Sequence, residues 1–380
     1  MATAGTSHTK RILSIDILRG IVMVVMALDH TRDFYSNFKF EPTDLQHAST
    51  IMFLTRWITH FCAPVFVFLS GTSVFLSGSS KPKKEVFTRL LTRGLWLLVL
   101  EVTLVRTGWA FDLNYHTIFL QVIWAIGWSM ILLSVLIFLP FRIILAIGLL
   151  MIFGHNAFDG YHPAGTWGIV WQFLHIQGPV HYGNSKTIFI IYPLIPWLGV
   201  MAVGYCFGAI YKLDEQRRKK SLYMVGLSAI ALFIIIRGIN GYGDPAPWHM
   251  QAAWWRTILS FVNCSKYPPS LLYLLMTLGI AITFLPALER MGGIVAKIFL
   301  VYGRVPMFYY ILHLYLIHSM AIIADYFIKG TTAVSVFEHP GYSLPVVYLF
   351  WLTAVAILYF PCRWFMGIKA KHRMWWLSYL

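Results

Sequence analysis

Residues 12–30 read ILSIDILRGIVMVVMALDH, an apolar run that carries Asp16 and Arg19 inside it and ends on Asp29-His30. A buried ionisable group costs a membrane-spanning helix about 2.5 kcal/mol or more, so several such groups on one span indicate a working surface. One face of an α-helix built from this run holds Asp16, Arg19, Gly20, Met23, Ala27 and His30. Because Asp16 and His30 lie about 21 Å apart along the axis, this polar face crosses most of a bilayer.

The composition of the whole chain is that of a polytopic membrane protein. It has 380 residues, of which 58% are hydrophobic and only 12% charged, and its mean hydropathy is +0.67. Soluble domains carry about 25% charged residues. Apolar windows predict about ten spans, at 12–29, 52–77, 90–107, 118–139, 142–154, 187–211, 221–238, 269–287, 304–326 and 344–366. We therefore expect an all-α transmembrane helix bundle that forms a single domain over 1–380, with short tails at 1–11 and 367–380.

Positive charge is concentrated in alternate loops of this arrangement. One set of loops holds 20 Lys and Arg residues and the other holds 8, so the positive-inside rule places both termini in the cytoplasm. The richer set comprises Lys10, Arg11, Lys81, Lys83, Lys84, Arg89, Arg93, Arg142, Lys212, Arg217, Arg218, Lys219, Lys220, Arg290, Lys297, Arg304, Arg363, Lys369, Lys371 and Arg373. The net charge of +15 therefore reflects the orientation of the chain in the membrane. We expect no nucleic-acid partner.

The longer outward loops, near 155–186, 239–268 and 327–343, are rich in Trp and His. We interpret the aromatic residues as an interfacial belt, with a platform for a saccharide as the alternative. The histidines among them are His155, His162, His175, His181 and His249. The four scattered cysteines form neither a disulfide framework nor a zinc motif, and we expect no metal.

Two histidines near the outward ends of spans are candidate catalytic groups. His30 follows Asp29 and precedes Asp33 by one turn, and an imidazole beside a carboxylate can act as a general base or accept an acyl group. His60 precedes Pro64, which should free a backbone carbonyl and bend the helix so that His60 approaches His30. The alternative to a catalytic role is an ordinary hydrogen bond at the membrane interface for His30, and a hydrogen bond that stabilises the bend for His60.

Further candidates lie at both ends of the spans. Arg89 and Arg93 are spaced i, i+4, which suits phosphate oxygens, although such clusters usually fix topology alone. His313 is deep in an apolar run, so it must face protein or water. The segment that contains Asn263, Lys266 and Tyr267 can bond an acceptor or simply lead into the next span.

Four segments together resemble the bacterial branch of the heparan-α-glucosaminide N-acetyltransferase catalytic-domain family: residues 14–30, 59–71, 263–273 and 303–318. The resemblance implies a multi-pass transferase of a bacterial inner membrane. It would move an acyl group, typically acetyl, from cytoplasmic acetyl-CoA to a sugar-type acceptor on the far side. The His of the family's opening motif corresponds to His30. In lysosomal members an Asn resembles this position and the active His lies farther along the outer loop, where His47 and His60 are the nearest counterparts.

The residues and the resemblance support one scheme. Inner cations, Arg19, Arg89, Arg93 and Arg304, would hold the phosphates of the donor, and His30 would act at the outer end with Asp29 and His60 as supports. The passage or acceptor site would include Asp16, Asp33, Asn263, Lys266, Tyr267 and His313. The alternative is a transporter or exporter with an intramembrane path of Asp, Arg and His. The sequence leaves room for a homodimer.

Overall fold

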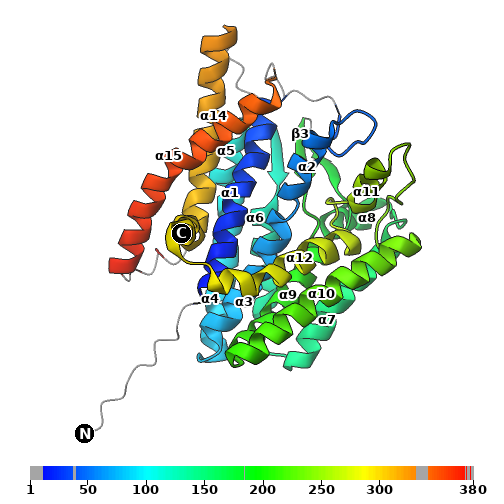
Figure 1. Cartoon of the computed structure of the whole chain (residues 1–380), viewed down its shortest axis with the longest axis vertical. Helices are drawn as coiled ribbons and strands as arrows, with labels where there is room; N and C mark the ends of the chain where they lie inside the picture. Colours follow the sequence, from blue (N-terminus) through cyan, green and yellow to red (C-terminus); the bar gives the residue numbers. More distant parts are fainter. Residues whose placement is uncertain are drawn as a thin grey trace.

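The computed structural model describes residues 12–36, 40–183, 185–330, 341–372, 374 and 377, with only the backbone of Lys329. The predicted tail at 1–11, with Lys10 and Arg11, lies outside these residues, as do Lys39 and Arg373. The helices are α1 (Leu13–Tyr35), α2 (Thr50–Thr59), α3 (Cys62–Gly78), α4 (Lys83–Leu100), α5 (Arg106–Ala110), α6 (Val122–Leu136), α7 (Phe141–Gly154), α8 (Gly165–Leu174), α9 (Leu194–Phe207), α10 (Glu215–Ile239), α11 (Trp254–Val262), α12 (Leu271–Arg290), α13 (Gly293–Arg304), α14 (Pro306–Lys329) and α15 (Leu344–Lys371). Shorter helical segments are η1 (Glu101–Val105), η2 (His155–Phe158) and η3 (Gly208–Lys212). The chain is an all-α transmembrane bundle, as predicted (Figure 1).

Each predicted span overlaps at least one of these helices, and the span predicted at 52–77 overlaps both α2 and α3. Within the described residues, seven helical segments are long and apolar enough to cross a membrane: Thr50–Gly78, Phe141–Phe158, Leu194–Lys212, Glu215–Ile239, Leu271–Arg290, Pro306–Ile328 and Leu344–Lys371. The other three predicted spans correspond to α1, α4 and α6. Charged side chains interrupt α1 and α4, and α6 has 15 residues. The count of ten therefore stays a prediction.

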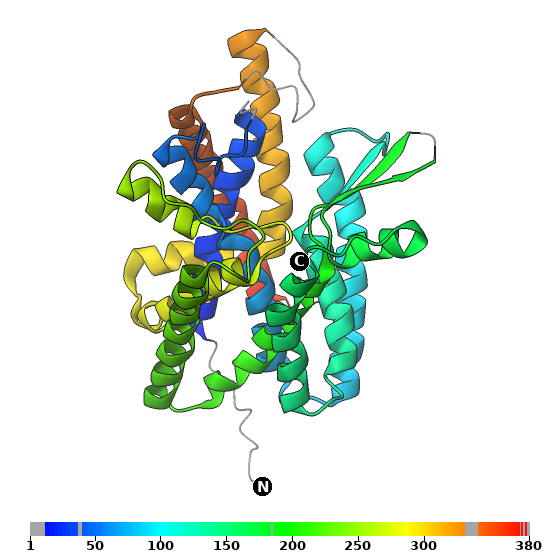
Figure 2. The same cartoon turned by 90° about the vertical axis from the view of Figure 1, so that its right-hand side faces the viewer.

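Two predicted spans begin too early in the sequence. The stretches β1 (Thr117–Leu120) and β3 (Lys186–Ile190) are strands, and with β2 (Gly178–Tyr182) they form a sheet of order β1-β3-β2. β1 pairs parallel with β3, with Thr117 opposite Thr187, and β2 pairs antiparallel with β3. Their backbone groups bond to one another, so the following helices start only at Val122 and Leu194. Figure 2 shows the β2–β3 hairpin projecting beside the helices.

Helix α1 lies at the centre of the bundle and contacts α2, α3, α12, α13, α14 and α15 (Figure 1). Glycine permits the closest of these approaches. A Cβ atom on Gly20 would lie 2.0 Å from the carbonyl oxygen of Phe299, and one on Gly303 would lie 1.8 Å from that of Asp16. Helix α13, which the predicted spans left as a loop between 287 and 304, therefore packs backbone to backbone against the N-terminal half of α1.

The break and the free carbonyl predicted at Pro64 are confirmed. The predicted approach of His60 to His30 stays a prediction, since the described ring contact of His60 is with Tyr273. Helix α2 ends at Thr59 and α3 begins at Cys62, which leaves His60 and Phe61 at the break. Pro64 has no N–H to donate to the carbonyl of His60, and that oxygen instead accepts a hydrogen bond from the Tyr273 hydroxyl at 2.6 Å. A neighbouring helix thus satisfies the carbonyl that proline frees, and the backbone of His60 is held at the start of α3.

Candidate functional site

A cationic cavity of about 450 Å³ lies where the starts of α1, α4 and α14 meet the ends of α3 and α15. Its ionisable lining residues are Arg19, Lys81, Glu85, Arg89, Arg93, Arg304 and Lys369. All four arginines predicted to hold the donor are among them. The meeting of three helix starts with two helix ends agrees with the alternating direction predicted for the spans. We call this space the inner cavity.

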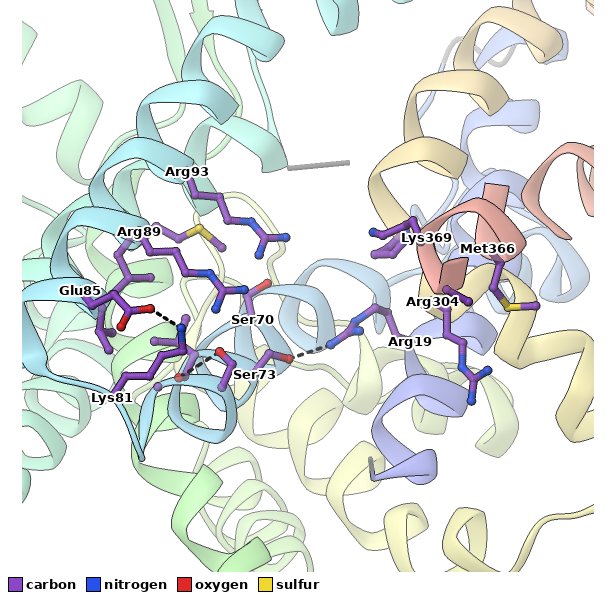
Figure 3. A pocket seen from close by; sticks show the side chains of 18 residues that line it. Arg19, Ser70, Ser73, Lys81, Glu85, Arg89, Arg93, Arg304, Met366 and Lys369 are labelled. Carbon is purple, nitrogen blue, oxygen red and sulfur yellow. Dashed lines mark hydrogen bonds and ion pairs between the residues drawn. The ribbon is translucent and has the colours of Figure 1, made fainter. Parts of the chain in front are cut away.

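The side chains of the inner cavity come from opposite walls (Figure 3). Arg89 and Arg93 extend from α4 toward the gap, and Arg19 and Lys369 extend from the other side. The hydroxyl-bearing Ser70 and Ser73 of α3 lie between the walls. Six cations facing one carboxylate make a space that favours a polyanion, and guanidinium groups pair well with phosphate oxygens.

Asp16 organises the inner cavity rather than lining it. Its side chain is buried and accepts a hydrogen bond from Arg19 Nη1 at 3.4 Å, while its other oxygen lies 3.8 Å from Arg304 Nε. Arg19 also donates to Ser73 Oγ at 2.8 Å and to the carbonyl of Gly303 at 3.3 Å. The aspartate predicted for a passage therefore holds two arginines in place at the edge of the cavity.

The middle of the polar face of α1 is packed against protein. Met23 is 1% exposed and Ala27 is fully buried, and Gly20 touches the backbone of α13. The polar face of α1 is therefore not one continuous wall: Arg19 lines the inner cavity, and the residues of this face between Arg19 and His30 are packed against protein.

His30 forms a direct pair with His313 of α14. Their Nδ1 and Nε2 atoms, respectively, are 2.6 Å apart, and the rings are stacked. His313 Nδ1 lies 3.1 Å from the carbonyl oxygen of Tyr309, which can only accept a hydrogen bond. With both rings neutral, His313 therefore carries its proton on Nδ1, which donates to the Tyr309 carbonyl. The Nε2 of His313 then accepts a hydrogen bond from His30 Nδ1. His30 consequently has its proton on Nδ1 and a lone pair on Nε2. This is the form required of a general base.

Asp29 is the centre of a buried ion cluster. Its carboxylate contacts Arg56 Nη1 at 2.6 and 2.7 Å, Arg32 Nη2 at 2.8 Å and Lys266 Nζ at 3.4 Å. It also accepts a hydrogen bond from Thr59 Oγ1 at 2.9 Å. These contacts tie the end of α1 to α2 and to the loop before α12. We predicted that Asp29 supports His30, but its described side-chain contacts are with Arg32, Arg56, Thr59 and Lys266.

A larger cavity of about 1260 Å³, the outer cavity, lies at the opposite end of α1. Five predicted residues line it: Asp33, His60, Asn263, Lys266 and Tyr267. The ring of His30 lies one layer behind, with its centroid 4.9 Å from that of Trp109, which does line the cavity. His47 is elsewhere in the outer loop, where its exposed ring lies 2.6 Å from Asp44. The hydrogen bond from His47 and that from the Gln46 backbone lower the pKa of Asp44.

Sequence reasoning missed the wall of the outer cavity formed by α5, β1 and the turn between them. This wall contributes Arg106, Trp109, Asp112, His116 and Gln121. Arg106 Nη2 donates to Asp112 Oδ1 at 2.7 Å. Burial raises the pKa of Asp112, but the hydrogen bonds from Arg106 and from the backbone of Asn114 and Tyr115, together with the charge of Arg106, lower it overall. These residues were missed because they fall at the end of the predicted span 90–107, in the loop after it and at the start of the span 118–139, where apolar windows do not indicate a cavity. His155, Asp159 and His175 form a further cluster in the outer loops.

The fold and the two cavities define a polytopic membrane protein in which one ionisable helix connects a polyanion-type site to a polar and aromatic site. The chain belongs to the family described as heparan-alpha-glucosaminide N-acetyltransferase, catalytic, whose model matches residues 11–241. Membership makes it a membrane acetyltransferase-like protein and implies an acyltransferase enzyme. A comparison with curated proteins gave no match. The family match covers Arg19, His30, His60, Arg89 and Arg93 and ends before His313 and Arg304.

Proposed function

We propose that the protein transfers an acetyl group from cytoplasmic acetyl-CoA, held in the inner cavity, to a saccharide-type acceptor held in the outer cavity. The observation that supports this most strongly is the position of Arg19 and His30 on α1. They are 11 residues apart, which is three turns and about 16 Å along one face. At one end of that face, Arg19 is one of six cations that line the inner cavity. At the other end, His30 has a lone pair on Nε2.

The inner cavity suits the anionic part of coenzyme A. That molecule carries a pyrophosphate and a 3′-phosphate, and each charge-assisted hydrogen bond to such groups contributes about 1.5–3 kcal/mol. Arg89 and Arg93 share one face of α4, and Lys369 approaches from α15. We assign these cations to the phosphates and place the inner cavity on the cytoplasmic side of the cell membrane, in accord with the charge distribution of the loops.

The chemistry proposed for His30 is general-base catalysis. Its Nε2 would take the proton of an acceptor hydroxyl or amine as that oxygen or nitrogen attacks the thioester carbonyl. The new ester or amide bond forms, the carbon–sulfur bond breaks, and the coenzyme A thiolate leaves and takes up a proton. The imidazolium that forms on His30 donates through Nδ1 to His313 Nε2, so the second ring holds the first in the required tautomer.

The outer cavity suits a polar acceptor with flat apolar faces. Trp109, Phe119 and Tyr267 offer aromatic surfaces, and Asn263 and Lys266 offer hydrogen-bond donors. Asn263 is itself fixed by donating to the carbonyl of Thr43 at 3.1 Å. The family's name describes a glucosaminide acceptor, and we propose an acceptor of the same chemical class, a saccharide with a free amine or hydroxyl.

The experiment that tests this proposal uses the full chain in sealed proteoliposomes. Acetyl-CoA is supplied to the side of the inner cavity and glucosamine-type saccharides to the other side, and free coenzyme A thiol and acetylated saccharide are measured together. We expect both products in equal amounts, and a loss of at least about 100-fold in His30→Gln. The matched control, His47→Gln, removes an exposed imidazole of the outer loop and should keep full activity.

Three other outcomes would contradict the proposal. Flux of the saccharide across the vesicle membrane without thiol release would support the transporter alternative. Full transfer by His30→Gln with loss in His47→Gln would move the reaction to the outer loop. Label from acetyl-CoA that stays on the quenched protein at His30 would replace direct transfer by an acyl-histidine route.

A further inference from the structure

Three metal-ligand side chains meet in the outer loops, and none of the three lines the inner or the outer cavity. His155 begins η2, Asp159 follows it, and His175 caps the end of α8. One ligand atom of each lies within 4.8 Å of the others, and His175 Nε2 is 3.2 Å from Asp159 Oδ1. This cluster could not be predicted from the sequence, because His155 and His175 are 20 residues apart and only the fold brings them together.

The two imidazoles of this cluster are buried with polar atoms unsatisfied. His155 and His175 are each 2% exposed. Both ring nitrogens of His155 and the Nδ1 of His175 have no hydrogen-bond partner among the described residues. Leaving a buried donor or acceptor unpaired costs about 1–3 kcal/mol. A metal ion can bind one nitrogen of each ring, so these unpaired nitrogens beside a carboxylate point to a missing ligand rather than to a packing role.

Neighbouring residues hold the cluster in a defined geometry. Asn156 donates from Nδ2 to Asp159 Oδ2 at 2.8 Å, which leaves the other carboxylate oxygen facing His175. The Oδ1 of the same Asn156 accepts from the backbone N–H of Leu271 at 2.9 Å, at the start of α12. The indole of Trp171 lies 5.2 Å from the ring of His175. Outer contacts of this kind fix the ligands of natural metal sites.

We propose that His155, Asp159 and His175 bind one divalent transition-metal ion, with Zn²⁺ the best match. Two imidazoles and a carboxylate are a common zinc ligand set, with bonds of about 2.0–2.2 Å and a fourth, open position. The side chain of Asp159 is 25% exposed, so an ion can enter the cluster past this carboxylate. The ion joins the end of α7 to the end of α8 and, through Asn156, to α12.

The test measures metal in the full chain purified in detergent without chelators. We expect about one equivalent of zinc per chain by elemental analysis. The same amount should return when stripped protein is incubated with Zn²⁺ and dialysed. The variants His155→Gln and His175→Gln should each retain less than about a tenth of this, since removing even an outer-shell partner weakens binding 10–100-fold. The matched control is His162→Gln, which alters an exposed histidine of the same outer loop.

Substitution with Co²⁺ gives a second readout that does not depend on activity. The visible absorption of four-coordinate Co²⁺ should appear in the wild type and in His162→Gln and be absent in His155→Gln, with all three proteins eluting as the same monodisperse species. Equal zinc in the wild type and both cluster variants would overturn the proposal. So would a wild-type protein that binds neither Zn²⁺ nor Co²⁺. Because the proposed acetyl transfer is not measured, failure of that proposal leaves this test unaffected.

Discussion

Removing Arg89 and Arg93 should weaken the binding of acetyl-CoA without affecting the fold. Both guanidiniums extend into the inner cavity from one face of α4, and Arg89 is exposed, so solvent screens its charge. We therefore take the lower end of the range for a charge-assisted hydrogen bond, about 1.5 kcal/mol for each arginine. That corresponds to a rise in Kd of roughly tenfold for Arg89→Gln or Arg93→Gln, and of roughly 100-fold for the double variant.

The assay is calorimetric titration of the purified chain with acetyl-CoA at two salt concentrations. The matched control is the double variant Lys83→Gln/Lys84→Gln, which removes the same charge from the first turn of α4 but from residues that do not line the cavity. Repeating the titration with 3′-dephospho-acetyl-CoA tells which phosphate the arginines contact. If an arginine pairs with the 3′-phosphate, substituting that arginine should no longer raise the Kd when the ligand is 3′-dephospho-acetyl-CoA.

Two results would refute this reasoning. A Kd for the Arg89/Arg93 double variant within twofold of the wild type would mean that the cavity does not hold the donor's phosphates. An equal loss in the Lys83/Lys84 control would mean that the effect is general attraction to a basic surface rather than contact inside the cavity.

Three other substitutions follow from the packing of α1. His313→Phe removes the acceptor of the His30 Nδ1 proton, so kcat should fall at least about 100-fold while the Kd of acetyl-CoA stays unchanged; equal kcat would refute the tautomer argument. Asp29→Asn leaves buried cations without a counterion and should lower the free energy of unfolding by about 3–5 kcal/mol, measured by thermal unfolding in detergent; an unchanged Tm would refute the cluster's structural role. Gly20→Val forces a side chain against the Phe299 carbonyl and should unfold at lower temperature than the open-space control Gly292→Val; identical transitions would contradict the close approach.

Much of the bundle could be predicted because membrane helices must be long, apolar and bounded by charge. The inner cavity was also accessible to sequence reasoning. Its arginines lie at predicted span ends on one side, and helices of alternating direction bring such ends together. Pro64 was equally informative, since the missing N–H identified the carbonyl that Tyr273 satisfies.

The outer site was harder to predict because its partners are distant in sequence. The neighbour of His30 is His313 rather than the adjacent Asp29, whose carboxylate points to Arg56 and Lys266 instead. Adjacent residues on a helix project about 100° apart, so the position of Asp29 next to His30 in the sequence does not make their side chains partners. The strands β1 and β3 lie in apolar runs that are equally compatible with the start of a membrane span. Only the pairing of β1 with β3 in the structure distinguishes these strands from helix.

The most direct test of the central claim is a single-turnover experiment with His30→Gln. The variant and the wild type are loaded with radiolabelled acetyl-CoA, mixed with a glucosamine-type saccharide, and quenched over a series of times. We expect His30→Gln to bind acetyl-CoA with the wild-type Kd and to form acetylated saccharide at least about 100-fold more slowly. Transfer at the wild-type rate by a variant that binds acetyl-CoA normally would contradict the role assigned to this imidazole.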